Sequence, residues 1–217
     1  MRKIRLNNLM LRAAACFVDY ESAQLVPTSR IVEYGYVYGK LMDLKPMRAL
    51  DVGCVALHNY ISPALAMNGC QTYGVDIRKE WGFKHPNFHF VQGDIRNPLL
   101  FGEKFDTIFC ISTLEHIGLP GYYGNTLYDK FGDVHAVHGM RSCLRDGGTL
   151  ILTVPYKDTF LERPGARVYD RPTIQKLLNT FAITNYVIYK LEKDNWVQVE
   201  NTESEGVICL TAVKRQP

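Results

Sequence analysis

Glycine and acidic residues follow the apolar segments of this chain, in a pattern typical of a ligand-binding edge. Three short apolar runs are each followed by such a residue, namely Gly53, Asp76 and Asp94. Runs of this length bounded by glycine are typical of buried strands, and the carboxyl ends of parallel strands meet at one edge of a sheet. A glycine there lets the backbone approach a ligand, and an acid ending the next strand can hold both hydroxyls of a ribose. The sequence therefore predicts a nucleotide-binding crevice.

A fourth apolar run, residues 105–111, opens into the segment Ser112-Thr-Leu-Glu-His-Ile-Gly118. Its hydroxyl, carboxyl and imidazole groups would lie at the same edge, because this run also reads as a strand of the sheet. Four strand ends with polar residues then outline one crevice.

The segments around these strands predict the elements that position the crevice. Apolar residues recur at helical spacing after Pro27, so a helix is expected there, with Thr28 or Ser29 as its N-cap. Asp170 is the expected N-cap of a later helix, with Pro172 in its first turn. The expected helices cover residues 59–68, 133–144 and 171–179, and a fifth strand covers residues 149–154.

The end of the chain predicts strand direction. Residues 183–189 and 207–213 read as strands, and residues 196–199 are a candidate for a further short one. Only residues 201–206 separate the last two, whereas a parallel crossover needs about a dozen residues or more. We therefore expect a hairpin there and an antiparallel last strand.

From about Leu50 to Tyr156 the chain resembles the class I S-adenosylmethionine-dependent methyltransferases. The glycine turn, the acids and the segment after the fourth strand carry this resemblance. Together with His85-Pro-Asn-Phe88, they are most similar to methyltransferases associated with surface-glycan synthesis. The resemblance implies an α/β fold, a Rossmann-like three-layer sandwich with a mostly parallel seven-stranded sheet and an antiparallel C-terminal strand.

The resemblance also implies S-adenosyl-L-methionine as the cofactor. In that family the glycine loop passes beside the methionine part, and the acids after the second and third strands bind the ribose and the adenine amine. The segment after the fourth strand faces the sulfonium. The cofactor-binding residues implied in this way are Asp51, Gly53, Cys54, Asp76, Ile77, Asp94, Ile95 and Ser112.

The loop after the first strand departs from the family pattern, since Val55 and Leu57 stand where glycines usually recur. A side chain costs little where the backbone keeps a negative φ and much where φ must be positive. Either the loop takes an ordinary conformation or the cofactor lies slightly further out. The same departure favours one alternative, a non-catalytic module that binds the cofactor without turnover.

A nicotinamide or flavin dinucleotide is the rival cofactor. Its fingerprint, Gly-x-Gly-x-x-Gly, rests a pyrophosphate on a helix N-terminus. After Gly53 the next glycine is Gly69, and Asp94 suits an adenine better than phosphates. A nicotinamide-dependent oxidoreductase is therefore the less favoured alternative.

Methyl transfer from a sulfonium is an in-line displacement, so alignment and exclusion of water can supply most of the rate. A hydroxyl acceptor also needs a general base. His116 is the first choice, because the ordinary histidine pKa of about 6.5 suits neutral pH; its other role would be to order its loop by a backbone hydrogen bond. Asp133 is an alternative base, and Tyr123 could stack on a sugar or attract the sulfonium. His135 and His138 share a helix face without a clear third ligand, so no metal site is predicted.

The acceptor is expected to be a small polar molecule, in the first place a sugar hydroxyl in glycan or natural-product biosynthesis. The segment 156–171 carries Lys157, Arg163, Arg167 and Arg171. A cationic lining would fit a phosphorylated acceptor such as a nucleotide sugar, although charged loops are also commonly just solvated.

Composition excludes several other classes. The net charge is +3 without a dense basic run, which argues against a nucleic-acid partner, and no segment reaches transmembrane length. The six cysteines form no C-x-x-C pair, which is typical of reduced, buried residues in a cytoplasmic protein. At 217 residues, the chain has the length of one domain, with a helical N-terminal cap over residues 1–46 and a core over residues 47–217.

Overall fold

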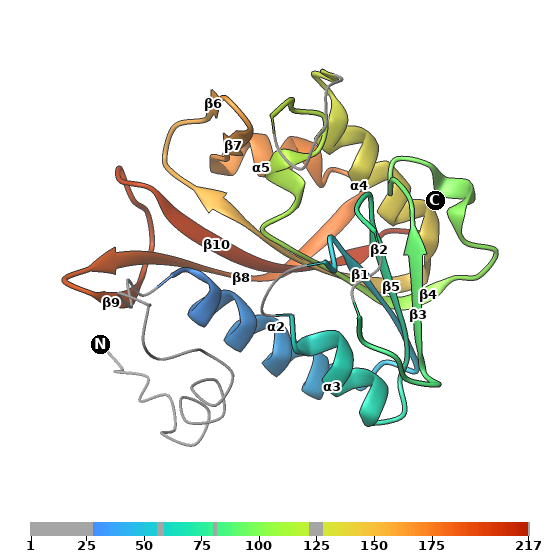
Figure 1. Ribbon diagram of the computed structural model, residues 1–217. Coiled ribbons are helices and arrows are strands. Elements are labelled where there is room, and N and C mark those ends of the chain that lie inside the picture. Colours follow the sequence, from blue (N-terminus) through green and yellow to red (C-terminus); the bar gives the residue numbers. More distant parts are fainter. Residues whose placement is uncertain (1–27, 56–58, 80–81, 122–127, 217) are drawn as a thin grey trace.

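The structure, a computed structural model, describes residues 28–55, 59–79, 82–121 and 128–216 (Figure 1). The helices are α2 (Arg30–Leu44), α3 (Ile61–Met67), α4 (Gly132–Cys143) and α5 (Arg171–Leu177), with two short 3-10 turns, η1 (Pro98–Leu100) and η2 (Leu114–His116). The strands are β1 (Arg48–Val52), β2 (Gln71–Asp76), β3 (Phe88–Gln92), β4 (Phe105–Ile111), β5 (Leu144–Tyr156), β6 (Leu161–Arg163), β7 (Ala166–Val168), β8 (Phe181–Glu192), β9 (Asn195–Val199) and β10 (Gly206–Lys214). These bounds confirm the expected helices to within a few residues.

Within the described chain the main sheet has eight strands in the order β3-β2-β1-β4-β5-β10-β8-β9. β1 is parallel to β2 and β4, and the parallel arrangement continues to β3 and β5. β10 is antiparallel to both of its neighbours, β5 and β8. The expected mostly parallel sheet with an antiparallel C-terminal strand is confirmed. The expected number of seven strands is wrong by one.

The additional strand is β9, which pairs antiparallel with β8 at the edge of the sheet. Lys193 and Asp194 form the two-residue turn between them, and both have positive φ values, 46° and 63°. Turns of this handedness match the twist of antiparallel strands.

The hairpin expected between β9 and β10 is wrong. β10 is a continuous apolar run buried along most of its length, so it fits an interior position between β5 and β8. β9 has only half-buried and exposed residues, which suits an edge. The chain therefore crosses β8 at the level of Ile188 and Tyr189 instead of turning back along β9.

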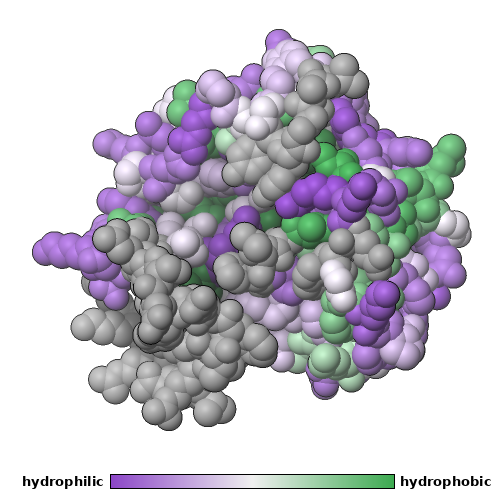
Figure 2. Space-filling view, viewed as in Figure 1, coloured by the Kyte–Doolittle hydropathy of each residue, from purple (hydrophilic) through white to green (hydrophobic). Residues whose placement is uncertain are grey.

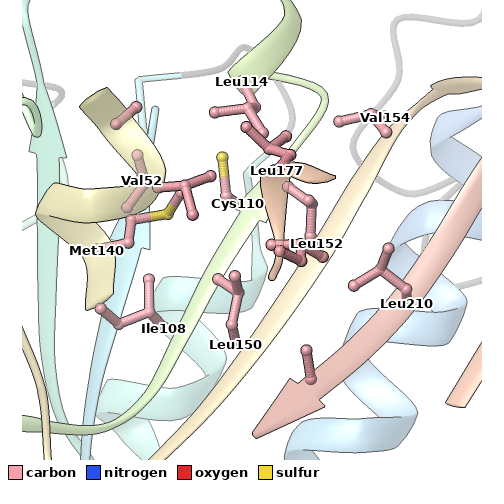
Figure 3. Packing of buried hydrophobic residues seen from close by; sticks show 14 of the residues in the cluster. Val52, Ile108, Cys110, Leu114, Met140, Leu150, Leu152, Val154, Leu177 and Leu210 are labelled. Carbon is pink, nitrogen blue, oxygen red and sulfur yellow. The ribbon is translucent and has the colours of Figure 1, made fainter. Parts of the chain in front are cut away.

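Helices cover both faces of the sheet, with α2 and α3 on one side and α4 and α5 on the other (Figure 1). On the first side, Val37 and Leu41 of α2 pack with Ile61 of α3 against Phe109 and Ile151. The larger core lies on the second side, where side chains of α4, α5 and the central strands interdigitate (Figure 3). The three-layer sandwich is thereby confirmed, and each fully buried side chain of this size stabilises it by roughly 1.5–3 kcal/mol.

Local polar contacts fix the helix starts. The Asp170 carboxylate accepts a hydrogen bond from the Thr173 N–H at 2.8 Å, which confirms it as the N-cap of α5. α2 begins after Ser29, whose hydroxyl donates to Glu33 one turn later rather than accepting from a backbone N–H. This arrangement brings the first turn of α2 over the carboxyl ends of β4 and β5, because the Arg30 guanidinium donates to the carbonyl of Ile111.

The face drawn in Figure 2 is largely hydrophilic, with smaller areas of hydrophobic residues between the polar ones. Among the residues that the structure describes, no helix has the length and hydropathy needed to cross a membrane. The five cysteines in this part of the chain are all buried, and none of them forms a disulfide.

Candidate active site

The turn after β1 depends on Gly53. Its φ is +80°, and its N–H donates to the carbonyl of Val75 on β2 at 2.8 Å. A Cβ at this position would lie 2.3 Å from the Oγ1 of Thr113, so glycine is required both by conformation and by space. The next residue, Cys54, is fully buried beside it.

Asp51, on β1, stabilises the loop that follows this turn. Its Oδ2 accepts hydrogen bonds from the Asn59 side-chain amide at 2.5 Å and from the Ser62 hydroxyl at 2.6 Å. Burial raises the pKa of Asp51 to about 6, and these two hydrogen bonds limit the rise. Because Asn59 and Ser62 lie at the start of α3, Asp51 joins β1 to the helix that follows the loop.

Asp76 ends β2 and is 6% exposed. Its Oδ2 accepts from the Val55 N–H at 3.0 Å and from Nη2 of Arg78 at 2.8 Å. Its Oδ1 accepts from the backbone N–H and the Nε of Arg78, each at 2.9 Å. All four lone-pair positions of the carboxylate are therefore engaged. The neighbouring Ile77 is exposed.

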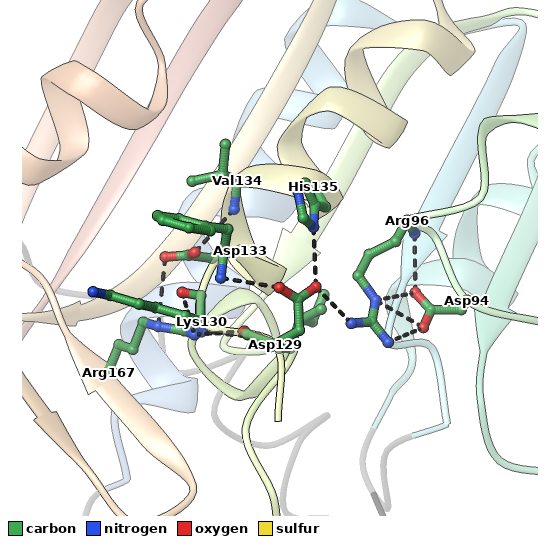
Figure 4. A network of polar contacts seen from close by, with 10 residues as sticks. Asp94, Arg96, Asp129, Lys130, Asp133, Val134, His135 and Arg167 are labelled. Carbon is green, nitrogen blue, oxygen red and sulfur yellow. Dashed lines mark hydrogen bonds and ion pairs between the residues drawn. The ribbon is translucent and has the colours of Figure 1, made fainter. Parts of the chain in front are cut away.

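Asp94 repeats this arrangement, because Asp94-Ile95-Arg96 has the same local sequence as Asp76-Ile77-Arg78. Arg96 donates to both Asp94 oxygens from its backbone N–H, Nε and Nη2, at 2.6–3.1 Å. Its Nη1 donates to the Asp129 carboxylate at 2.9 Å, which His135 also contacts (Figure 4). The Asp94 turn is thus tied to the start of α4. Ile95 is buried, and a Cβ on Gly139 of α4 would meet its carbonyl oxygen at 1.9 Å, so α4 can approach this turn only through a glycine.

Ser112 follows β4 with a φ of +38°, a conformation rarely adopted by residues other than glycine. Its N–H donates to the carbonyl of Thr153 at 3.0 Å, and its hydroxyl donates to the carboxylate of Glu33. The Thr153 hydroxyl donates to the same Glu33 oxygen at 2.7 Å. Glu33 is fully buried, so α2 holds the ends of β4 and β5 through this one carboxylate.

Glu115 and His116 lie in η2, directly after Ser112 and Thr113. Glu115 is buried, its Oε2 has no hydrogen-bond partner among the described residues, and burial raises its pKa to about 8. His116 Nδ1 donates to the carbonyl of Gly165 at 2.5 Å, which leaves the lone pair on Nε2, 3.7 Å from Glu115 Oε1. Burial lowers the pKa of His116, so the imidazole is neutral at pH 7. A neutral acid and a neutral base are thus adjacent.

Asp133 lies on α4, where both of its oxygens are engaged. It accepts from the Tyr169 hydroxyl at 3.0 Å and from the Val134 N–H at 2.9 Å, and the buried Arg167 guanidinium lies 3.7 Å away. Arg167 also donates to the carbonyl of Ile117 at 2.8 Å, which links Asp133 to the segment after His116 only indirectly. The third expected catalytic residue, Tyr123, lies outside the described residues.

The structure therefore brings Gly53, Asp76 and Asp94 to the ends of three adjacent strands, with Ser112 and His116 after the fourth. Sequence reasoning missed the roles of Arg78 and Arg96. The repeated Asp-Ile-Arg is a signal that could have revealed them, because an arginine two residues after an acid can fold back on it. Within the described chain no cluster of three metal-binding side chains occurs.

A groove of about 320 Å³ opens beside Ser112, between the start of α2 and the ends of β5, β8 and β9. Ser29 and Ser112 contribute hydroxyls, and Pro155, Leu191, Trp196 and Val207 contribute apolar surface.

Solved structures of methyltransferases share this fold at low sequence identity. NodS, an N-methyltransferase from Bradyrhizobium japonicum WM9 solved with S-adenosylhomocysteine, is 16% identical with a TM-score of 0.60, over 96% of this chain and 98% of its own. The 1,6-didemethyltoxoflavin-N1-methyltransferase of Burkholderia thailandensis was solved with 1,6-didemethyltoxoflavin and S-adenosylhomocysteine. It is 15% identical with a TM-score of 0.59, over 96% of this chain and 87% of its own. An S-adenosylmethionine-dependent methyltransferase from Clostridium acetobutylicum ATCC 824 is 14% identical with a TM-score of 0.60, over 97% and 100%.

The chain thus has the Rossmann-like fold of class I methyltransferases. No curated protein matches the sequence. Residues 73–211, from β2 to β10, match the family described as "Caenorhabditis protein of unknown function, DUF268". Because this match spans more than half of the sequence, the chain belongs to the DUF268 family.

Proposed function

We propose that this protein is an S-adenosylmethionine-dependent methyltransferase that acts on a small polar acceptor. The observation that carries the proposal is the order of three groups along the sheet edge: Gly53 after β1, Asp76 ending β2 and Asp94 after β3. The methionine, ribose and adenine parts of the cofactor follow one another in the same order. The bound S-adenosylhomocysteine of NodS and of the toxoflavin enzyme, which share the fold, supports the same cofactor here.

Cofactor binding requires that hydrogen bonds within the protein are broken first. Because Arg78 and the Val55 N–H fill every lone-pair position of Asp76, a ribose hydroxyl must replace a guanidinium hydrogen bond. The same exchange applies at Asp94 and Arg96 for the adenine amine. We therefore assign Asp76 to the ribose and Asp94 with Ile95 to the adenine, with both arginines as competitors.

The bound cofactor would supply an electrophilic methyl group, and the residues after β4 would do the rest. We assign the role of general base to His116, since its Nε2 holds the lone pair and its lowered pKa keeps it neutral. It would take the proton of the acceptor hydroxyl as the oxygen bonds to the methyl carbon and the bond from that carbon to sulfur breaks. Asp133 is less suited, because Tyr169 and Val134 engage its two oxygens and the Arg167 guanidinium lies beside them. We propose a sugar hydroxyl as the acceptor, in cytoplasmic glycan or natural-product biosynthesis.

Methyl transfer from radiolabelled S-adenosylmethionine to a panel of sugars tests this function. The His116→Ala variant should lose at least tenfold in turnover and keep its affinity for S-adenosylhomocysteine. A variant that loses cofactor affinity while its turnover at saturation is unchanged would give His116 a structural role instead.

A non-catalytic cofactor-binding module is the second candidate. The observation that favours it is the full engagement of Asp76 and Asp94 by Arg78 and Arg96, since a site closed in this way need not turn over. Binding of S-adenosylhomocysteine together with no transfer to any sugar, amine or carboxylate acceptor would support this candidate over the enzyme.

A further inference from the structure

The groove beside Ser112 opens at the end of β4, the strand after which His116 also lies. One of its lining residues is Ser112, which follows β4 next to Thr113 and the turn at Gly53. We propose that this groove is a subsite for one uncharged sugar ring, in which Trp196 of the β8–β9 hairpin forms the stacking surface. The subsite deepens the proposed function and rests on it for the identity of the methyl donor.

Strand pairing sets the apolar wall of the groove. Trp196 is opposite Leu191 in the β8–β9 ladder, and Val207 is opposite both Tyr189 and Pro155. Residues directly opposite one another, or two apart on a strand, point to the same face of a sheet. Leu191, Trp196, Val207 and Pro155 therefore form one continuous surface on the α2 side, and all four line the groove. β9, the strand that the sheet has in addition to the seven expected, thus adds an aromatic residue to this wall.

The opposite wall is polar. Thr28 and Ser29 line the groove from the start of α2, and Ser112 lines it after β4. The Ser29 and Ser112 hydroxyls donate to Glu33, and their remaining lone pairs can accept hydrogen bonds from the hydroxyls of a sugar. One apolar wall with an aromatic ring and one wall of hydroxyls match a pyranose, which has an apolar C–H face and polar edges. The volume of about 320 Å³ is at the small end of the range for small-molecule sites, about 300–1,000 Å³.

The charges around the groove argue against a phosphorylated sugar. Glu205 is the charged residue among those that line it, and Arg163 contacts both of its oxygens at 2.9 Å. Arg167 is buried and contacts carbonyls and carboxylates, and Arg171 contacts Glu200 and Asn201. The arginines of the segment 156–171 are therefore engaged within the protein. A diphosphate would have to draw Arg163 away from Glu205 and leave that carboxylate unpaired, so the structure favours a neutral sugar over a nucleotide sugar.

Saturation-transfer NMR on the full chain tests the subsite. The probes are methyl α-D-glucopyranoside, methyl α-L-rhamnopyranoside and UDP-glucose, each with and without S-adenosylhomocysteine. The Trp196→Ala variant removes the stacking surface. Tyr186→Ala is the matched control, since Tyr186 is an exposed aromatic residue of β8 whose position in the ladder points to the opposite face, where Arg171 covers it.

We expect at least one methyl pyranoside to bind the wild type, with at least tenfold weaker binding to Trp196→Ala and unchanged binding to Tyr186→Ala. UDP-glucose should bind no more tightly than the pyranosides. The subsite is overturned if Trp196→Ala binds as the wild type does, if the diphosphate adds affinity, or if S-adenosylhomocysteine binds and no pyranoside does. If a pyranoside binds through Trp196 while S-adenosylhomocysteine does not bind, the subsite stands and the methyltransferase function fails.

Discussion

Asp76 and Glu115 are two buried carboxyl groups at the same edge of the sheet, and they differ in the hydrogen bonds that their surroundings offer. Asp76 accepts four hydrogen bonds from N–H groups, three of them from Arg78. Glu115 has one oxygen without any partner in the described chain, and burial raises its pKa to about 8. Asp76 is thus paired with a guanidinium, whereas Glu115 is a neutral acid at neutral pH.

The difference assigns roles along the edge. An ion-paired carboxylate suits recognition of hydroxyl and amine donors, whereas a neutral acid beside a neutral imidazole suits proton movement. A carboxyl group with a raised pKa beside a histidine with a lowered pKa is typical of an acid–base site. We infer that the edge divides into a binding half over β1 to β3 and a reacting half after β4.

The largest effect concerns the stability contribution of Glu115. Its folded pKa of about 8 lies above the ordinary glutamate value, so the folded state holds a proton that the unfolded state has lost. That contribution is fully present below about pH 4.5 and is lost as the pH rises to about 8. We expect the wild type to lose roughly 2–4 kcal/mol relative to Glu115→Gln between pH 5 and pH 8.5.

Urea unfolding of both proteins at the two pH values measures this difference. Glu192→Gln is the control, because Glu192 is exposed and should show no such change. Parallel pH profiles for the wild type and Glu115→Gln would mean that Glu115 is ionised in the folded protein, and the division of the edge would fail.

The next effect concerns cofactor affinity. Asp76→Ala removes the acceptor of the ribose hydroxyls and should weaken S-adenosylhomocysteine binding by about 1–3 kcal/mol. Isothermal titration calorimetry gives the affinity, and circular dichroism checks the fold of the variant. An unchanged affinity in a folded Asp76→Ala protein would remove Asp76 from the ribose site.

Arg78→Ala sharpens the comparison further. If Arg78 competes with the ribose for Asp76, its removal should tighten S-adenosylhomocysteine binding by about 1 kcal/mol. Arg145→Ala is a suitable control, since Arg145 pairs with Asp106 on an exposed surface away from the crevice. Weaker binding to Arg78→Ala would show instead that the arginine orients Asp76 for the cofactor.

The smallest effect is expected at Asp94, whose side chain is 35% exposed compared with 4% for Asp76. Asp94→Asn should weaken binding of S-adenosylhomocysteine by about 0.5–1 kcal/mol, because a solvated hydrogen bond contributes less. The same titration gives the value. A loss larger than that of Asp76→Ala would reverse the order that burial predicts.

Much of the fold was predictable from the sequence, because the first four strands are short apolar runs and each is followed by glycine or polar residues. β9 was harder to predict with confidence, since its turn is Lys193-Asp194 and contains no glycine. β10 lies between β5 and β8 because its apolar residues are buried there. The short connection from β9 to β10 does not reveal this position.

The site divides in the same way. Gly53, Asp76 and Asp94 could be placed from strand ends, because sheet geometry fixes where these ends meet. The contact of Glu33 with Ser112 and Thr153 could not, because it joins residues about 80 and 120 positions apart through tertiary packing. That Oε2 of Glu115 has no hydrogen-bond partner in the described chain likewise depends on tertiary packing around it.

Calorimetric titration of the wild-type protein with S-adenosylhomocysteine, with NAD as the control ligand, tests the central claim most directly. We predict micromolar binding of S-adenosylhomocysteine and no binding of NAD, since the dinucleotide fingerprint has three glycines whereas Gly53 is the only glycine of the sequence between β1 and Gly69. Binding of NAD, or of neither ligand, would contradict the assignment of this sheet edge to an adenosyl cofactor that carries a methyl group.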